Sequence, residues 1–269
     1  MSRRKPLSVR VLGAYGGSAP GYRLTSFLID GDCALDAGAL TETLSPAAQR
    51  RIRRVLLTHA HFDHITSLPF LVANLHGAEP PIEIVAPPPV LEAVRRHVFN
   101  GATWPDFARI PSARRPTIRY RPLEEGKPFD AGAFSVTAYP VHHVVPTYGY
   151  VVSADGVSVV FSGDTAPTER LWHAARRAEG VEAVFLECSF SDREKTLAED
   201  SQHLTPDLVA GELPKLPPAV PVFLYHVKPL SLVRIRREVA ALGTPRLRLL
   251  ESETAFRFGG SRRRAAASS

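Results

Sequence analysis

The pattern of hydrophobic and polar positions predicts a chain that alternates short strands with amphipathic helices. Apolar or alternating runs, many of them rich in valine, isoleucine and phenylalanine, are typical of strands that pack on at least one face. On this basis we predict strands at residues 8–12, 24–30, 33–36, 55–57, 82–85, 134–139, 148–153, 157–161, 183–187 and 222–225.

Helical spacing of apolar positions appears between several of these strands. We predict helices at residues 69–75, 90–99, 169–178, 206–213 and 230–242. Because helices are interspersed among the strands, the order favours sheets covered by helices, an α/β (α+β) fold class, over an all-β sandwich.

The length and composition are those of one globular domain. A chain of 269 residues with 44% hydrophobic and 22% charged residues can bury a full core without being divided. We therefore predict a single domain over residues 1–258. Residues 259–269 lack apolar periodicity and are expected to form a disordered basic tail.

Signals for export or membrane insertion are weak. The basic N-terminus has no uninterrupted apolar run, and the charge-free stretch at residues 131–154 is broken by prolines, histidines and a glycine. Cys33 and Cys188 lie far apart in apolar contexts, which suits buried thiols better than a disulfide. These features favour a cytoplasmic protein with no membrane partner.

The net charge of +6 raises the question of a nucleic-acid partner. Much of the basic excess lies at the two ends and at residues 49–54, without the interleaved aromatic residues of a binding motif. A small-molecule substrate is therefore favoured over nucleic acid.

The densest group of metal-binding side chains follows the predicted strand at residues 55–57. His59, His61, Asp63 and His64 form an HxHxDH cluster directly before a helical pattern. Imidazole and carboxylate groups suit zinc and similar transition metals, and a turn that concentrates them is hard to explain structurally. The cluster predicts a metal site.

The segment THAHFDH resembles the signature motif of the metallo-β-lactamase-fold hydrolases. LDAG at residues 35–38, FSGDT at 161–165 and YHVKP at 225–229 agree with this resemblance, which covers roughly residues 9–250. It implies a four-layer αβ/βα sandwich and two divalent metal ions, with zinc preferred and manganese or iron also compatible. The implied ligands are His59, His61 and His143 for one metal, Asp63, His64 and His226 for the other, and Asp164 as the bridge.

His143 stands next to His142, and neighbours on a strand point to opposite faces, so only one of them can face the metals. Composition does not decide between them. The spacing of His143 to the following PTYGY resembles that of the ligand in phosphodiesterase and ribonuclease Z relatives, which favours His143 and leaves His142 a peripheral role.

A narrower resemblance concerns the class II cyclic-nucleotide phosphodiesterases and their bacterial relatives. It rests on the ordered stretches LGAYGG, TSFLID, HFDHITSLPFL, FNGATWPDF, LECSF, HLTP and LYHVKP. It implies that His203 lies near the scissile phosphate, as a proton donor or charge stabiliser. We further expect the strand-end carboxylate of Glu187 to orient His203, and Asp63 to accept or orient the proton of the attacking water. The competing interpretations are a helix-entry His203 and a surface Glu187.

These resemblances predict a phosphodiesterase that opens a 3′,5′-cyclic nucleotide such as cyclic AMP with a hydroxide shared between two metals. The first alternative is a ribonuclease Z-like enzyme that processes tRNA 3′ ends, although no Gly-Pro-rich tRNA-gripping insertion is evident. The second alternative is another hydrolase of the same fold with a different substrate. A non-enzymatic alternative is a metal-stabilised scaffold protein. The family resemblance also implies a homodimer.

Overall fold

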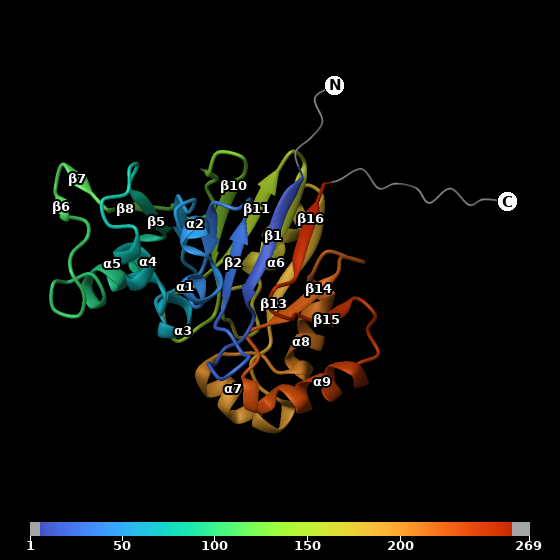
Figure 1. Ribbon diagram of the computed structural model, residues 1–269. Coiled ribbons are helices and arrows are strands. Elements are labelled where there is room, and N and C mark those ends of the chain that lie inside the picture. The colour runs from blue at the N-terminus through green and yellow to red at the C-terminus, as the bar shows by residue number, and fades with distance from the viewer. Residues whose placement is uncertain (1–5, 260–269) are drawn as a thin grey trace.

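The computed structural model describes residues 6–259, and the prediction for residues 260–269 of the basic tail lies outside them. Within this range, two seven-stranded mixed sheets pack face to face, with helices on their outer sides (Figure 1). This is the α/β architecture that the alternation of strands and helices predicts.

The first sheet is built mainly from the N-terminal half, in the order β16-β1-β2-β3-β4-β5-β8. Its strands are β1 (Leu7–Gly13), β2 (Ser26–Ile29), β3 (Cys33–Leu35), β4 (Arg54–Leu56), β5 (Ile82–Ala86), β8 (Ile118–Pro122) and β16 (Ala255–Phe258). Pairing is antiparallel from β16 to β3 and parallel from β3 to β8.

The second sheet follows the order β15-β14-β13-β12-β11-β10-β9. Its strands are β9 (Phe129–Asp130), β10 (Ser135–Pro140), β11 (Tyr148–Ala154), β12 (Val157–Phe161), β13 (Val181–Glu187), β14 (Val222–Tyr225) and β15 (Leu247–Leu249). Strands β12 to β15 run parallel, and the others pair antiparallel. A short hairpin, β6 (Pro111–Ser112) and β7 (Arg115–Pro116), stands apart from both sheets.

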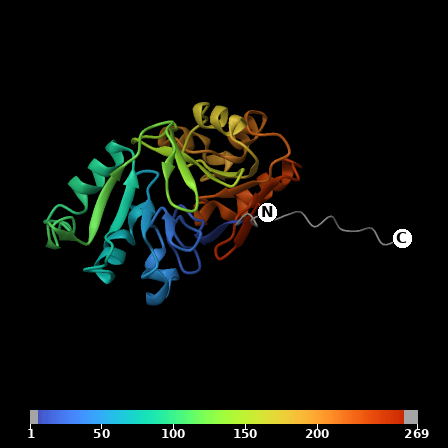
Figure 2. The ribbon, with the colours of Figure 1, turned by 90° about the horizontal axis from the view of Figure 1, so that it is seen from above.

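Helices from the two halves of the chain cover opposite sides of this double sheet (Figure 2). Those of the first half are α1 (Leu40–Thr43), α2 (Pro46–Gln49), α3 (Phe62–Ile65), α4 (Leu68–Asn74) and α5 (Pro88–His97). Those of the second half are α6 (Arg170–Arg177), α7 (Lys195–Ser201), α8 (Pro206–Glu212) and α9 (Leu232–Ala241), with the 3₁₀ turns η1 (Asp192–Glu194), η2 (Leu213–Lys215) and η3 (Pro229–Ser231). None of the described helices is long and apolar enough to cross a membrane.

The hydrophobic core has two main parts. One lies between the sheets and continues beneath the helices of the second half, and in it Phe27 of β2 contacts Phe161 of β12 and Phe185 of β13 at ring distances of 5.1 and 5.5 Å. The other lies between the first sheet and the helices of the first half. Helix, sheet, sheet and helix therefore form the four layers expected from the family resemblance.

All of the predicted strands and helices are present, with ends that differ by a few residues. The pattern missed α7, although it has seven residues, as many as α4 and α8. Most of the other elements that it missed are short or lie at sheet edges. For example, β8 carries Arg119 and Arg121 on its exposed side, and β16 is an edge strand that alternates exposed with less exposed residues. Edge strands bury little apolar surface, so their hydrophobic signal is weak.

Both cysteines are free and fully buried, as their apolar surroundings predict.

The sheet topology brings the predicted site residues to one edge of the molecule. Parallel strands end at a common edge, so the segments that follow β3, β4, β12, β13 and β14 gather there.

Candidate metal centre

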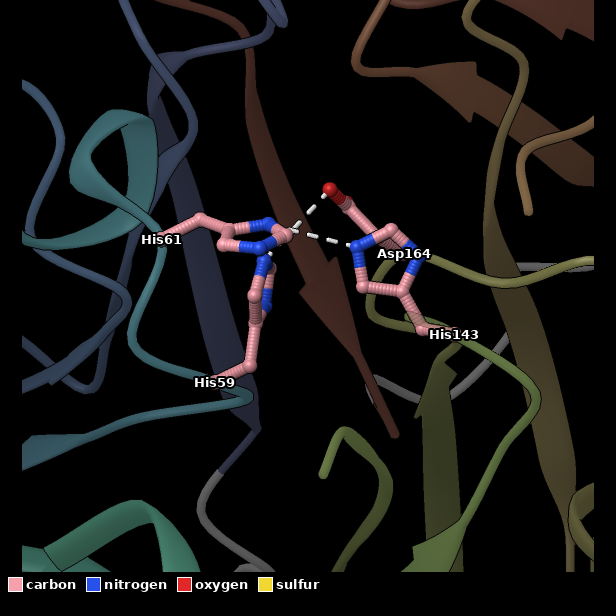
Figure 3. Close-up of side chains that lie close together, drawn as sticks. All are labelled: His59, His61, His143 and Asp164. Atoms are coloured by element: carbon pink, nitrogen blue, oxygen red, sulfur yellow. Dashed lines mark hydrogen bonds and ion pairs between the residues drawn. The ribbon is translucent and has the colours of Figure 1, made fainter. Parts of the chain in front are cut away.

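The structure brings all seven sequence-predicted metal ligands together at this common edge. The first cluster contains His59, His61, His143 and Asp164, whose potential ligand atoms lie within 4.8 Å of one another. In Figure 3 these side chains converge from different segments. His59 and His61 come from the loop after β4, His143 follows β10, and Asp164 follows β12. Nδ1 of His61 lies 3.2 Å from Nε2 of His143.

Asp63, His64 and His226 form the second cluster, within the same 4.8 Å limit. Asp164, a member of the first cluster, also lies close to the second: its Oδ2 is 3.7 Å from Nε2 of His59, 3.2 Å from that of His64 and 3.1 Å from that of His226. This central position is the one that a bridging carboxylate would need.

The buried histidines of the two clusters are held through their Nδ1 atoms. Nδ1 of His59 lies 3.0 Å from the Thr58 hydroxyl, and Nδ1 of His226 lies 2.8 Å from the Thr25 hydroxyl. Nδ1 of His64 lies 2.7 Å from Oδ2 of Asp36. A partner on one ring nitrogen fixes the orientation of the ring and directs the other nitrogen, Nε2, to the centre.

His143 is held in the same manner by a main-chain group. Its Nδ1 lies 3.1 Å from the carbonyl oxygen of Gln202, which can only accept, so Nδ1 carries the proton. The lone pair of a neutral His143 ring is then on Nε2, the atom that faces His61.

The atoms at the centre lack the hydrogen bonds that buried polar groups normally make. Among the described residues, Nε2 of His59, His64 and His226 and Oδ1 of Asp164 are buried without a hydrogen-bond partner. Such orphaned atoms are costly unless something else satisfies them. Their convergence fits metal ions, and the two clusters are consistent with a dinuclear metal site.

Burial and nearby charges shift the pKa values of these side chains. Burial lowers the pKa of His59 and of His226 well below the usual histidine value, which favours the neutral ring that a metal ligand needs. Burial raises the pKa of Asp164, but the neighbouring His226 and His64 outweigh it and lower that pKa well below the ordinary range. The bridging candidate is therefore an ionised carboxylate.

Three residues that contact the rings of candidate ligands were not predicted from the sequence: Thr25, Asp36 and Thr58. Asp36 accepts hydrogen bonds from the Thr58 main-chain N–H at 2.8 Å and from its hydroxyl, in addition to contacting His64. Its φ of 56° is in the left-handed region, where aspartate is tolerated better than most residues. The LDAG motif marked this position, but only the fold shows what its carboxylate touches.

The paired glycines near the N-terminus also have a structural reason. A Cβ on Gly16 would lie 2.6 Å from both the ring and the main-chain oxygen of His226. Glycine is therefore required for the loop after β1 to pack against this histidine.

His203 lies beside both clusters. Its ring centroid is 4.9 Å from that of His143 and 5.5 Å from that of His226. Nδ1 of His203 lies 2.7 Å from Oε1 of Glu187, which is fully buried, so Glu187 is not a surface residue. Burial lowers the pKa of His203, but the adjacent carboxylate of Glu187 outweighs this and raises the pKa above its usual value.

His142 points away from the clusters. Its ring is exposed, and its Nδ1 contacts the main-chain oxygen of Pro167 at 2.8 Å. Asp63, in contrast, is at the rim: its side chain is 25% exposed, and Oδ2 lies 3.7 Å from Nζ of Lys228. Lys228, to which the sequence assigned no role, therefore places a cation at the edge of the second cluster.

Comparison with known protein families shows to which superfamily the chain belongs. Residues 26–226 match the profile of a beta-lactamase superfamily domain. The chain belongs to the metallo-β-lactamase superfamily. Its fold is shared by solved structures that include the metallo-beta-lactamase fold protein YhfI from Bacillus subtilis, with a TM-score of 0.75, 18% identity and coverage of 94% of this chain and 100% of that one. Unliganded yeast PDE1 has a TM-score of 0.80 and 18% identity, and the match covers 93% of this chain and 99% of that one.

Within the superfamily, two curated relatives carry different activities in their names. A probable 3′,5′-cyclic-nucleotide phosphodiesterase of Yersinia pestis is 24% identical over 275 residues, covering 82% of this chain and 78% of that protein. Ribonuclease Z of Mycobacterium bovis is 30% identical over 137 residues, covering 47% of this chain and 49% of that enzyme. The match thus spans about half the length of that ribonuclease.

Proposed function

We propose that this protein is a dinuclear metal-dependent hydrolase that acts on phosphodiesters, and that its substrate is a 3′,5′-cyclic nucleotide such as cyclic AMP. The observation that carries the proposal is the position of Asp164 between two ligand clusters, with the His203–Glu187 pair beside both. The similarity to the Yersinia pestis phosphodiesterase along most of the chain supports the cyclic-nucleotide substrate.

In this proposal His59, His61 and His143 hold one divalent ion, Asp63, His64 and His226 hold the other, and Asp164 bridges them. Zinc is the preferred metal, and manganese or iron also suits this mixture of imidazole and carboxylate groups. Bound there, two divalent ions would lower the pKa of a water molecule and polarise the oxygens of a phosphate.

The remaining steps are assigned to side chains of the chain itself. Asp63, which is partly exposed at the rim, accepts or orients the proton of the attacking water. His203, whose protonated form Glu187 stabilises, donates a proton to the departing ribose oxygen. Nζ of Lys228 lies close enough to the second cluster to offset negative charge on the phosphate.

A second candidate is tRNA 3′ processing of the ribonuclease Z type. It is favoured by the 30% identity to the Mycobacterium bovis enzyme and by the net charge of +6. Its substrate would present the same kind of phosphodiester to the same clusters, so only the substrate separates the two proposals.

The test is a turnover screen of protein loaded with Zn²⁺ or Mn²⁺ against cyclic AMP, cyclic GMP, bis(p-nitrophenyl) phosphate and a precursor tRNA. We expect cyclic nucleotides to be opened, and Asp63→Ala to abolish this while the exposed Asp200→Ala leaves it unchanged. Cleavage of the precursor tRNA alone would move the assignment to the ribonuclease. Absence of turnover on every substrate with either metal would refute phosphodiester hydrolysis.

A further inference from the structure

A cavity of about 400 Å³ adjoins the first ligand cluster. Its walls come from α3 and the loop that leads into it, from α5 and the residue that follows it, and from residues 145–146. His61 belongs both to the cluster and to the cavity wall, and Val145 is two residues beyond His143. The same two segments that supply metal ligands therefore also shape this cavity.

The lining of the cavity is almost entirely apolar. Its only polar side chains are those of His61 and His97, and the rest are alanine, valine, isoleucine, proline and Phe62. Phe62, between two candidate ligands in the sequence, is 75% exposed. An exposed aromatic ring beside an apolar hollow is a feature that binding of an apolar partner would explain, because burial of that surface is favourable.

A larger cavity, of about 780 Å³, has a different character. It lies between α6 and strands β10 and β11, and its wall includes the exposed Arg170, Arg176 and Arg177. None of the candidate metal ligands contributes to it. Its position separates it from the clusters, so it serves as a control location.

We propose that the apolar cavity is a subsite for the flat aromatic group attached to the phosphate, which in a nucleotide is the base. This rests on the proposed function, because the metal clusters would hold the phosphate while the cavity holds the base. A ring inserted beside Phe62 would bury apolar area and stack on an aromatic side chain. The volume is in the usual range for small-ligand sites.

This arrangement selects substrates by the group that flanks the phosphodiester. A nucleobase or another flat aryl group can stack on Phe62 at the cavity wall, whereas an alkyl group cannot. His97 offers one polar contact at the wall, which suits the edge of a base.

A matched pair of substitutions tests the subsite. Ala93 of α5 lines the apolar cavity and Ala174 of α6 lines the control cavity, and both are half-buried on the surface of a helix. Ala93→Trp should fill the subsite, and Ala174→Trp should not affect it. The probe is adenosine, which has a base but no phosphate, and its binding is followed by saturation-transfer NMR and titration.

We expect adenosine to bind the wild type and Ala174→Trp, and its Kd to rise at least about tenfold in Ala93→Trp. The KM for cyclic AMP should rise in parallel, with the bound metal content unchanged by elemental analysis. Phe62→Leu, which keeps the apolar surface but removes the ring, is the second variant and should also weaken adenosine binding.

Failure of this proposal is distinguishable from failure of the proposed function. Adenosine binding that is lost in Ala93→Trp, without turnover of any phosphodiester, would support the subsite and refute the enzyme. Turnover of cyclic AMP with equal adenosine affinity in Ala93→Trp, Phe62→Leu and Ala174→Trp would overturn the subsite alone. Absence of adenosine binding to the wild type would also overturn it.

Discussion

Oε1 of Glu187, the last residue of β13, lies 2.7 Å from Nδ1 of His203. The ring of His203 in turn lies beside both ligand clusters. The Ser189 hydroxyl also donates to the second oxygen of Glu187, and the Thr165 main-chain N–H donates to the first. The carboxylate is thus fixed by several donors and stabilises the protonated form of the imidazole.

The first prediction concerns the pH dependence of turnover. Because Glu187 raises the pKa of His203, the acid form persists to higher pH, and Glu187→Gln should shift the alkaline limb of kcat to lower pH. His203→Ala should lower kcat by about 10²–10⁴-fold. The exposed Glu199→Gln is the control. An unchanged alkaline limb in Glu187→Gln would show that His203 is not the acid.

The second prediction concerns Asp36 and metal affinity. Its carboxylate orients His64 at 2.7 Å, and loss of such an indirect partner typically weakens metal binding by about 10–100-fold. Asp36→Asn should therefore release metal to a weaker chelator in a competition titration, while Asp200→Asn should match the wild type. Equal metal affinity in both variants would contradict the positioning role.

A third prediction is that metal removal destabilises the fold. Ligands that bind only the native state stabilise it by about 2.7 kcal/mol at a concentration of 100 times Kd. Chelation should therefore lower the Tm of the wild type by several degrees, measured by calorimetry. Asp164→Ala lacks the central carboxylate, so its Tm should respond much less, and an equal response would count against Asp164 as a ligand.

The fourth prediction compares two glycines. A Cβ on Gly16 would meet His226 at 2.6 Å, so Gly16→Ala should displace this ring and reduce the metal content of the second cluster. Gly211 lies within α8 with open space around it, and Gly211→Ala should raise the free energy of unfolding by about 0.5–1 kcal/mol with metal content unchanged. Elemental analysis and denaturant unfolding measure both effects, and full metal content in Gly16→Ala would refute the packing argument.

The sequence by itself determined the order of the main strands and helices, because their apolar runs bury large surfaces and therefore leave a strong pattern. The HxHxDH cluster was visible for a related reason: its four residues are adjacent in sequence, and their density has no ordinary structural explanation. Short edge strands such as β8 and β16 left little signal because one side of each is exposed.

Only the tertiary structure decided which distant groups meet. It gave Thr25, Asp36 and Thr58 their contacts with the rings of the candidate ligands. The resemblance had already favoured His143 over His142 and paired Glu187 with His203, and the structure adds the distances at which these groups meet. It also created the cavity between α3, α5 and residues 145–146. The physical reason is that a hydrogen bond or a cavity wall depends on distances across the fold, which the local sequence pattern does not encode.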